Sequence, residues 1–412
     1  MTKEWKPLNV AVLGAGLGGL AAAIAMRRNG HTVTVYERYH FAGEVGASLS
    51  CASNGGKHLK EWGIDFDAAK PIILKDLIRH DWKTGEIEGV YSLGDYEKAF
   101  GTPYYNFHRI DIHNVLMDTA TQEKGEGTPC KLLVDYKVID VNHESGHMVF
   151  ENGKEAYADL IIAADGIRST TREKIGVIPE FGISTSCCYR CLFRTEDVHK
   201  LGLKDFSKNE AIEFWGGNDK NKIVLSPCSD GEIVSCYCFY PAEINDLRED
   251  GWNNEATPEQ LLATFPELDG ALKELFKIAF DIKQWRLYVH KQYPYWVKGK
   301  VGLLGDAAHP QMPDQSQGAV MAFEDAAAFG YIFSKMFNFS PQDGLKVYQS
   351  VRQPRANKIQ AASLRARENL NERIGWSSGA ADLKDENRLT IEEVCSYNIK
   401  ADIDQIVKNM GL

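Results

Sequence analysis

A glycine-rich turn near the amino terminus constrains the fold of this chain more than any other feature. The segment GAGLGG, residues 14–19, follows an apolar run at 8–13 and precedes a helix-like stretch at 20–29. A strand-like run follows at 32–37, so the pattern predicts a strand–turn–helix–strand unit. The close glycines and the immediate second strand argue against a signal peptide or a membrane span.

The glycines fit the spacing G-x-G-x-x-G between a strand and a helix. Missing side chains let the backbone approach a pyrophosphate, and the helix amino terminus supplies amide donors. Glu37 closes the second strand, where a carboxylate can accept hydrogen bonds from ribose hydroxyls. These features predict a dinucleotide site, FAD or NAD, whose turn contacts are Gly14, Gly16, Leu17 and Gly19.

Charge and cysteine usage narrow the environment of the protein. The 412 residues carry 57 acidic and 47 basic side chains without long blocks, which argues against nucleic acid or an anionic membrane as the main partner. Nine cysteines without framework spacing favour a reduced, cytoplasmic protein. Those that cluster lie in strand-like stretches and are interpreted as small hydrophobes, with no metal expected: Cys187, Cys188, Cys191, Cys236 and Cys238.

Two later segments also end an apolar strand at an acidic turn. DLIIAADG ends on Asp165-Gly166, and VGLLGD ends on Gly305-Asp306. Each alone could be a simple strand-end turn, since these dipeptides are good turn formers. Gly318 then opens a helix expected over 319–337.

Together these motifs resemble the single-component (class A) FAD-dependent aromatic monooxygenases, the para-hydroxybenzoate hydroxylase-like flavoproteins. The segments GAGLGGLAAAIAMRRNGHTVTVYER, HRIDIHNVL, ADLIIAADGIRS, YRCLF, GKVGLLGDAAHPQMP and AFEDAAA occur in the family's order. The likeness covers about residues 1–365 and is strongest to the salicylate hydroxylase and 6-hydroxynicotinate 3-monooxygenase branch.

The resemblance implies FAD as the bound cofactor. Asp306 would accept a hydrogen bond from a ribityl hydroxyl, and the amides of Gly318 and Ala319 would face the flavin pyrimidine edge. Arg109 would contact the phosphate–ribityl region, and Asp165 belongs to a motif used for FAD and, indirectly, for the nicotinamide cofactor. The remaining implied contacts are Glu37, Arg38, Val45, Gly46, Ala47, Gly166 and Gly305.

The implied fold class is α/β: a Rossmann-like (GR2-type) FAD-binding domain with an interleaved, β-sheet-rich substrate domain and C-terminal helices. The expected FAD-binding parts are 1–71, 105–180 and 286–345, the substrate-domain parts are 72–104 and 181–285, and the C-terminal helices occupy 346–412.

The implied activity is hydroxylation of a phenolic or heteroaromatic small molecule. NADPH or NADH would reduce FAD transiently, and a C4a-hydroperoxyflavin formed with O₂ would deliver the oxygen. A cation near the ring would help ionise the substrate, and Arg190 and Lys222 are the candidates. The candidate pocket walls are Tyr189, Trp215, Leu225, Tyr237 and Pro313.

Departures from the branch leave the substrate open. Where that branch has a histidine near the flavin, this chain has Ser50. Where the branch has a histidine and a tyrosine on a substrate strand, this chain has Asn221 and Leu225. An epoxidase or dearomatising oxygenase, and a non-catalytic flavin redox sensor, stay as alternatives. The preference for NADH or NADPH and the choice between monomer and homodimer stay open as well.

Overall fold

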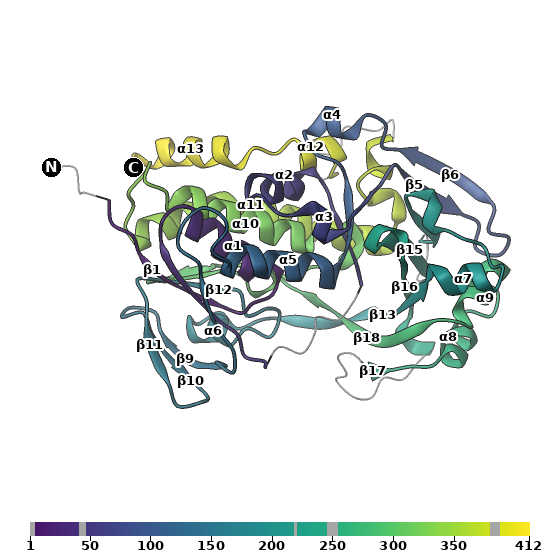
Figure 1. Cartoon of the computed structure of the whole chain (residues 1–412), viewed down its shortest axis with the longest axis horizontal. Coiled ribbons are helices and arrows are strands. Elements are labelled where there is room, and N and C mark those ends of the chain that lie inside the picture. The colour runs from purple at the N-terminus through teal and green to yellow at the C-terminus, as the bar shows by residue number, and fades with distance from the viewer. Residues whose placement is uncertain (1–4, 41–46, 218–220, 245–253, 380–387) are drawn as a thin grey trace.

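The computed structural model describes residues 5–40, 47–217, 221–244, 254–379 and 388–412. Of the expected cofactor contacts, Val45 and Gly46 lie outside these ranges. Two large sheets lie toward opposite ends of the long axis, and long helices cover the first of them (Figure 1).

The first sheet has six strands in the order β19-β20-β12-β1-β2-β8. The strands from β20 to β8 run parallel, and β19 joins the edge antiparallel. Parallel strands joined through helices make a doubly wound α/β unit, as the sequence predicted. The bounds are β1 Asn9–Leu13, β2 Thr32–Tyr36, β8 Lys131–Leu133, β12 Leu160–Ala163, β19 Val297–Lys298 and β20 Val301–Leu303.

Helices α1 (Leu17–Arg28) and α10 (Gly318–Ile332) pack together beside this sheet. Residues from Leu20 to Met26 of α1 are all buried, so this helix is apolar on every side because it lies between the sheet and α10. Gly330 of α10 approaches Ala25 so closely that an added Cβ would lie 3.0 Å from the Ala25 Cβ. The close packing explains the small residues in both helices.

The second sheet has eight strands in the order β17-β18-β13-β16-β15-β14-β5-β6. Its strands come from the two segments expected to form the substrate domain, with β18 extending to His290. The bounds are β5 Asp76–His80, β6 Ile87–Ser92, β13 Phe181–Arg194, β14 Ala211–Gly216, β15 Lys222–Cys228, β16 Ile233–Pro241, β17 Asn254–Glu255 and β18 Phe280–His290.

Two three-stranded sheets and the remaining helices complete the chain. One small sheet has the order β3-β7-β4 and the other β11-β10-β9. Their bounds are β3 Ser48–Cys51, β4 Ile72–Ile73, β7 Tyr105–His108, β9 Val138–Asn142, β10 His147–Phe150 and β11 Glu155–Tyr157. The helices are α2 Ser53–Glu61, α3 Phe66–Ala69, α4 Tyr96–Phe100, α5 Arg109–Thr121, α6 Thr170–Lys174, α7 Thr195–Lys200, α8 Pro258–Thr264, α9 Gly270–Phe276, α11 Pro341–Glu368, α12 Ile391–Cys395 and α13 Ile399–Met410.

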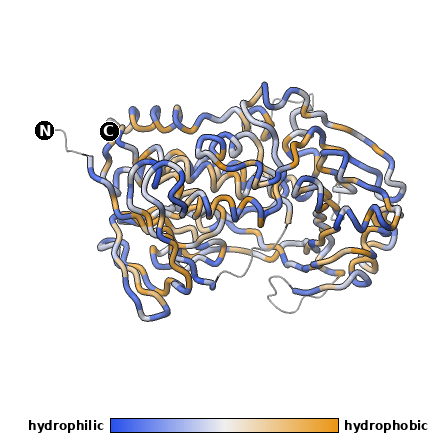
Figure 2. The backbone as a smooth tube through the Cα atoms, viewed as in Figure 1, coloured by the Kyte–Doolittle hydropathy of each residue, from blue (hydrophilic) through white to orange (hydrophobic). Residues whose placement is uncertain are grey.

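The outer helix α13 alternates between hydrophilic and hydrophobic residues along its length (Figure 2). Ile399, Ile403 and Val407 are buried at a spacing of four residues, which is the pattern of a helix with one face on the core. None of the helices in the described ranges combines the length and the apolarity needed to cross a bilayer.

One helix boundary was predicted wrongly. The helix expected over 319–337 ends at Ile332, where the amide of Phe333 bonds back to the carbonyl of Phe329. Asn338 then takes a left-handed φ of 51° before α11 begins. The apolar pattern continues past Ile332 because aromatic residues of the connecting segment also pack against the core.

Candidate active site

Four of the predicted motifs meet at one edge of the six-stranded sheet. Strands β2, β1, β12 and β20 are neighbours and run parallel, so their carboxyl ends lie together. Glu37 follows β2, Gly14 follows β1, and the turns containing Asp165 and Asp306 follow β12 and β20. In open α/β sheets this edge is where ligands bind, so the topology assembles a single candidate site.

The three fingerprint glycines have different neighbours. Gly14 has φ +102°, and a Cβ there would lie 2.4 Å from the carbonyl oxygen of Ala164. A Cβ on Gly19 would lie 2.0 Å from the carbonyl oxygen of Gly14. A Cβ on Gly16 would meet nothing within 4 Å. Gly14 and Gly19 therefore permit the turn, whereas Gly16 leaves room for a ligand at the start of α1, where Leu17 is buried and offers its backbone.

Glu37 links the glycine turn to the end of β2. One carboxylate oxygen accepts from the amide of Ala15 at 2.8 Å, and the other accepts from the amide of Tyr39 at 2.9 Å. Each oxygen retains capacity for a further donor, which suits a ribose hydroxyl. Arg38 is exposed and its guanidinium lies 4.7 Å from the centre of the Tyr39 ring.

Asp306 lies at the carboxyl end of β20. The preceding Gly305 has φ +61°, and its amide donates to the Asp325 carboxylate at 3.0 Å, which fixes the turn. The Asp306 residue is exposed at the sheet edge, yet the protein around its carboxyl displaces enough water to raise the pKa. Charges on His309, Arg109 and Arg172 oppose that rise. A partly desolvated acceptor suits a neutral hydroxyl donor such as a ribityl chain.

The Asp165 carboxylate organises its own turn. One oxygen accepts from the Ser169 hydroxyl at 2.5 Å, and the other accepts from the amide and hydroxyl of Thr171, both at 3.0 Å. Gly166, with φ +78°, has open space beside it. The structure thus shows Asp165 ordering the start of α6, and its contact with a cofactor stays a prediction.

The amino terminus of α10 faces the same region. Gly318 and Ala319 begin this helix, and the preceding Gln317 accepts from the Asn54 side chain at 2.9 Å. On the other side, the carbonyl of Ala47 accepts from the amide of Arg109 at 2.8 Å. The helix dipole therefore places partial positive charge where the flavin pyrimidine edge is expected.

A buried ion network that was not predicted from the sequence packs behind these turns. Arg352 donates to Asp325 at 2.8 Å and to Glu324 at 2.6 Å, and all three side chains are fully buried. His309 lies 2.7 Å from Asp325 through Nε2, and Arg355 donates to Glu324 at 2.7 Å. The available signal was the pair of adjacent carboxylates inside the otherwise apolar helix sequence AFEDAAA.

The eight-stranded sheet divides the predicted substrate residues between two faces. Side chains alternate along a strand, so residues paired across β15, β16 and β13 share a face. Lys222 of β15 pairs with Phe239 of β16, and Phe239 pairs with Cys188 of β13. Two residues along, Val224 of β15 pairs with Tyr237 of β16, and Tyr237 pairs with Arg190 of β13. Lys222, Tyr237 and Arg190 therefore lie on one face. The Tyr237 hydroxyl donates at 3.0 Å to the carbonyl of Ser48, which follows the expected flavin contact Ala47.

Tyr189, Trp215 and Leu225 lie on the opposite face. All three belong to a second hydrophobic cluster beneath the sheet. Tyr189 stacks on Tyr240 with ring centres 4.9 Å apart, and Trp215 stacks on His80 at 4.2 Å. The structure therefore assigns these three to core packing and does not bring them to the face that carries Arg190.

Arg190 is fully buried on the site-facing side of β13. Its Nη2 donates to the Asp281 carboxylate at 2.6 Å, and the guanidinium lies 6.0 Å from the Trp285 ring centre. Nε and Nη1 are buried and have no hydrogen-bond partner among the described residues. Buried donors without acceptors are costly, so this guanidinium is suited to an anionic or carbonyl-bearing ligand.

Lys222 is buried beside Asp314 and forms an ion pair with it. Burial lowers the pKa of Lys222 to about 8, although Asp314 opposes the shift. Pro313, the expected pocket wall, is exposed at the start of the short 3₁₀ turn Pro313–Gln315 that carries Asp314. Asp314 itself was not predicted, because nothing in the local sequence distinguishes it from a solvated loop carboxylate.

Three of the clustered cysteines lie close together across β13 and β16. The sulfurs of Cys191, Cys236 and Cys238 are all within 4.8 Å of one another. They are buried in the second hydrophobic cluster, where cysteine packs as a small apolar residue. Their surroundings are those of a core.

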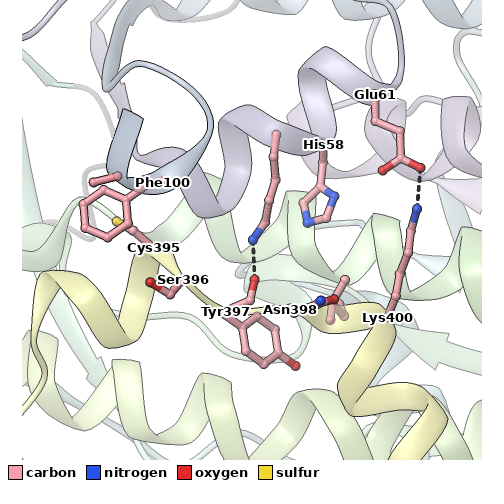
Figure 3. A pocket seen from close by; sticks show the side chains of 11 residues that line it. His58, Glu61, Phe100, Cys395, Ser396, Tyr397, Asn398 and Lys400 are labelled. Atoms are coloured by element: carbon pink, nitrogen blue, oxygen red, sulfur yellow. Dashed lines mark hydrogen bonds and ion pairs between the residues drawn. The ribbon is translucent and has the colours of Figure 1, made fainter. Parts of the chain in front are cut away.

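A recess of about 440 Å³ lies between α2, the end of α4 and the segment joining α12 to α13 (Figure 3). Glu61 pairs with Lys400 across it at 2.7 Å, and Lys57 donates to the carbonyl of Tyr397. Burial lowers the pKa of His58, on its wall, to about 4. None of the predicted cofactor or substrate residues lines this recess.

Comparison with known proteins decides the family. A family model described as an FAD binding domain matches residues 7–363. The chain is also 30% identical to hispidin-3-hydroxylase of Neonothopanus nambi, over 98% of this chain and 97% of that protein. The chain belongs to the FAD-binding monooxygenases.

Other members of this family agree with the predicted branch. The 6-hydroxynicotinate 3-monooxygenase of Pseudomonas fluorescens is 29% identical over 86% of this chain and 90% of that protein. A solved salicylate hydroxylase substrate complex has the same fold, with a TM-score of 0.72 and 21% identity over 98% of each chain. The resemblance, the fold class, the assignment as an FAD-dependent monooxygenase and FAD as cofactor are thereby confirmed.

Residues of this FAD-binding monooxygenase fit the cofactor. Gly16 leaves an open approach at the start of α1, Glu37 has acceptor capacity that would suit the adenosine ribose, and the exposed carboxylate of Asp306 would suit a ribityl hydroxyl. When bound, FAD supplies redox and oxygen chemistry that amino-acid side chains lack. The protein contributes binding, orientation and the electrostatics of the site.

Proposed function

We propose that this monooxygenase uses NADPH or NADH to hydroxylate a phenolic or heteroaromatic small molecule. The carrying observation is the sheet face that carries two buried cations, Arg190 on β13 and Lys222 on β15, two rungs apart and on either side of β16. A buried cation stabilises negative charge on a ring oxygen, and an ionised ring is a better target for electrophilic oxygen transfer.

The two cations have different tasks in this proposal. Arg190 has two donors without a partner among the described residues, and it binds an anionic or carbonyl group of the substrate directly. Lys222 stabilises the negative charge that develops on a ring hydroxyl of the substrate. Tyr237 lies on β16, between the strands that carry the two cations, and its hydroxyl donates to the carbonyl of Ser48.

The names of the relatives suggest the first compounds to test. Hispidin, 6-hydroxynicotinate and salicylate each carry an ionisable ring hydroxyl, and they form the phenolic panel.

The test is a screen of the FAD-loaded protein for NADPH and NADH oxidation with each member of the panel. The expected result is that at least one phenol stimulates oxidation about tenfold or more over the ligand-free rate, with a product one oxygen heavier. The Arg190→Met variant should retain FAD and lose that stimulation. If none of a broad panel of phenols and heteroaromatics changes the rate of NADPH or NADH oxidation, the proposal is contradicted.

A further inference from the structure

Asp314 is a buried carboxylate where three parts of the molecule meet. It lies between the two flavin motifs that contain Asp306 and Gly318, in the turn Pro313–Gln315. Its side chain is fully buried. A buried charge needs hydrogen-bonding or charged partners. The partners of Asp314 show which elements it connects.

The partners of Asp314 come from two other elements. Lys222, at the start of β15, and Arg367, on α11, both donate to the same oxygen, Oδ1, and the Arg367 distance is 3.2 Å. Lys222 also donates to the carbonyl of Ala366 on α11 at 3.4 Å. The other carboxylate oxygen, Oδ2, has no hydrogen-bond partner within the described ranges. Among the described residues, the hydrogen bonds to the Asp314 carboxylate therefore come from these two cations.

Neighbouring residues of the turn are attached elsewhere. Gln315 donates to the carbonyl of Glu372 at 2.7 Å and accepts from the amide of Ile374 at 2.8 Å, which ties the turn to the segment after α11. Gln317 bonds to Asn54 of α2. Asp314 supplies the ion pair that joins this turn to the substrate-facing strand β15.

We propose that Asp314 is a positioning residue: held by Lys222 and Arg367, it sets the flavin-facing start of α10 against the substrate face of β15. This inference rests on the proposed function, because it concerns the distance between flavin and substrate. Oxygen transfer needs reacting atoms within a narrow range, and a displacement of 1 Å can cost about 100-fold in rate.

The cluster also has a pH dependence. The groups facing Lys222 are Asp314 from the turn, Arg367 and Arg373 from the C-terminal segments and, beside Arg367 and Asp314, the Cys188 thiol from β13. Since the pKa of Lys222 is about 8, the ammonium is present below pH 8 and is lost above it. Above pH 8 the positioning contact should therefore weaken.

Asp314→Asn removes the positioning charge and leaves Arg190 with its own partner, Asp281. Because Asp314 raises the pKa of Lys222, that lysine also loses its proton more readily in this variant. With a stimulating phenol of the panel, the variant should oxidise NAD(P)H within about threefold of wild type. Product per NAD(P)H should fall about tenfold, with the remaining O₂ and two electrons appearing as hydrogen peroxide. Asp140→Asn, at the exposed pair with Lys174 (3.0 Å), is the matched control and should stay coupled.

A second readout needs no turnover. The visible circular dichroism of FAD bound to wild type, followed from pH 6 to pH 10, should show a transition near pH 8. Lys222→Arg keeps its charge and should abolish that transition, and Asp314→Asn should abolish it as well. A protein without stimulated NAD(P)H oxidation would contradict the proposed function alone. Full coupling in Asp314→Asn, or an unchanged dichroism transition in Lys222→Arg, would overturn this inference.

Discussion

Asp325→Asn tests whether the buried ion network behind the flavin turns stabilises them. Asp325 is fully buried and holds Arg352 through one oxygen and both the Gly305 amide and His309 through the other. The substitution removes the charge at almost constant volume. Arg352 keeps Glu324 as a partner, while Gly305 and His309 lose a charged acceptor.

The expected loss is about 3–5 kcal/mol, the cost of removing one partner from a buried ion pair. An unfolding entropy of about 2.1 cal/mol/K per residue gives about 0.9 kcal/mol/K for 412 residues, so the Tm should fall by about 3–6 °C. The affinity for FAD should fall as well, because Gly305 positions Asp306.

Calorimetry of the FAD-loaded and FAD-free forms measures both effects, with Asp140→Asn as control. That exposed pair should cost less than about 1 kcal/mol. Asp325 also has a pKa held below its usual range by His309 and Arg352 against the effect of burial. Its stabilisation is therefore present above about pH 4 and is lost as the pH falls further, so the variant should converge on wild type in acid. A Tm change below 1 °C with unchanged FAD affinity would show that the buried network does not stabilise the flavin turns.

Three further predictions follow from single residues. Asp306→Ala should purify with little FAD because the ribityl acceptor is gone, and a flavin-to-protein ratio equal to wild type would contradict the assignment. Gly16→Val should lower FAD affinity at least tenfold with an unchanged Tm of the FAD-free form, whereas Gly19→Ala should lower that Tm because its Cβ meets the Gly14 carbonyl. His58 has a pKa of about 4 because it is buried, against 6.5 for the free side chain, so stability should decline by up to about 3 kcal/mol as the pH falls from 6.5 to 4. His58→Phe should flatten that decline in urea titrations, and an identical slope would count against the burial argument.

The flavin edge of the site was predictable because its signals are local. Gly14, Gly16 and Gly19 have a spacing that only a strand-to-helix turn explains, and Asp306 ends a short apolar run. Parallel pairing then brings such strand ends together whatever the intervening sequence.

The substrate face was less predictable because it depends on which way a strand faces. Residues 186–193 of β13 are all buried, so the alternation does not show whether Tyr189 faces the site. Trp215 and Leu225 likewise lie on mostly buried strands, and all three predicted wall residues belong to the hydrophobic cluster below the sheet.

The contacts that position the flavin turns lie far apart in the sequence. Lys222 and Asp314 are 92 residues apart, and the partners of Asp325 lie on β20's turn and on α11. The pairing of Lys222 with Asp314 leaves no local pattern, because a buried ion pair needs only one residue from each element. For Asp325 the local sequence shows two adjacent carboxylates in an apolar helix but not their partners.

The central claim is that this chain transfers an oxygen atom from O₂ to an aromatic ring. The most direct measurement incubates the FAD-loaded protein with NADPH or NADH and the panel phenol that stimulates oxidation, under ¹⁸O₂. Mass spectrometry should find one ¹⁸O in the product, and the same reaction in H₂¹⁸O under ordinary O₂ should leave the new oxygen unlabelled. A product labelled from water, or hydrogen peroxide as the sole fate of O₂ with every aromatic tested, would contradict the account.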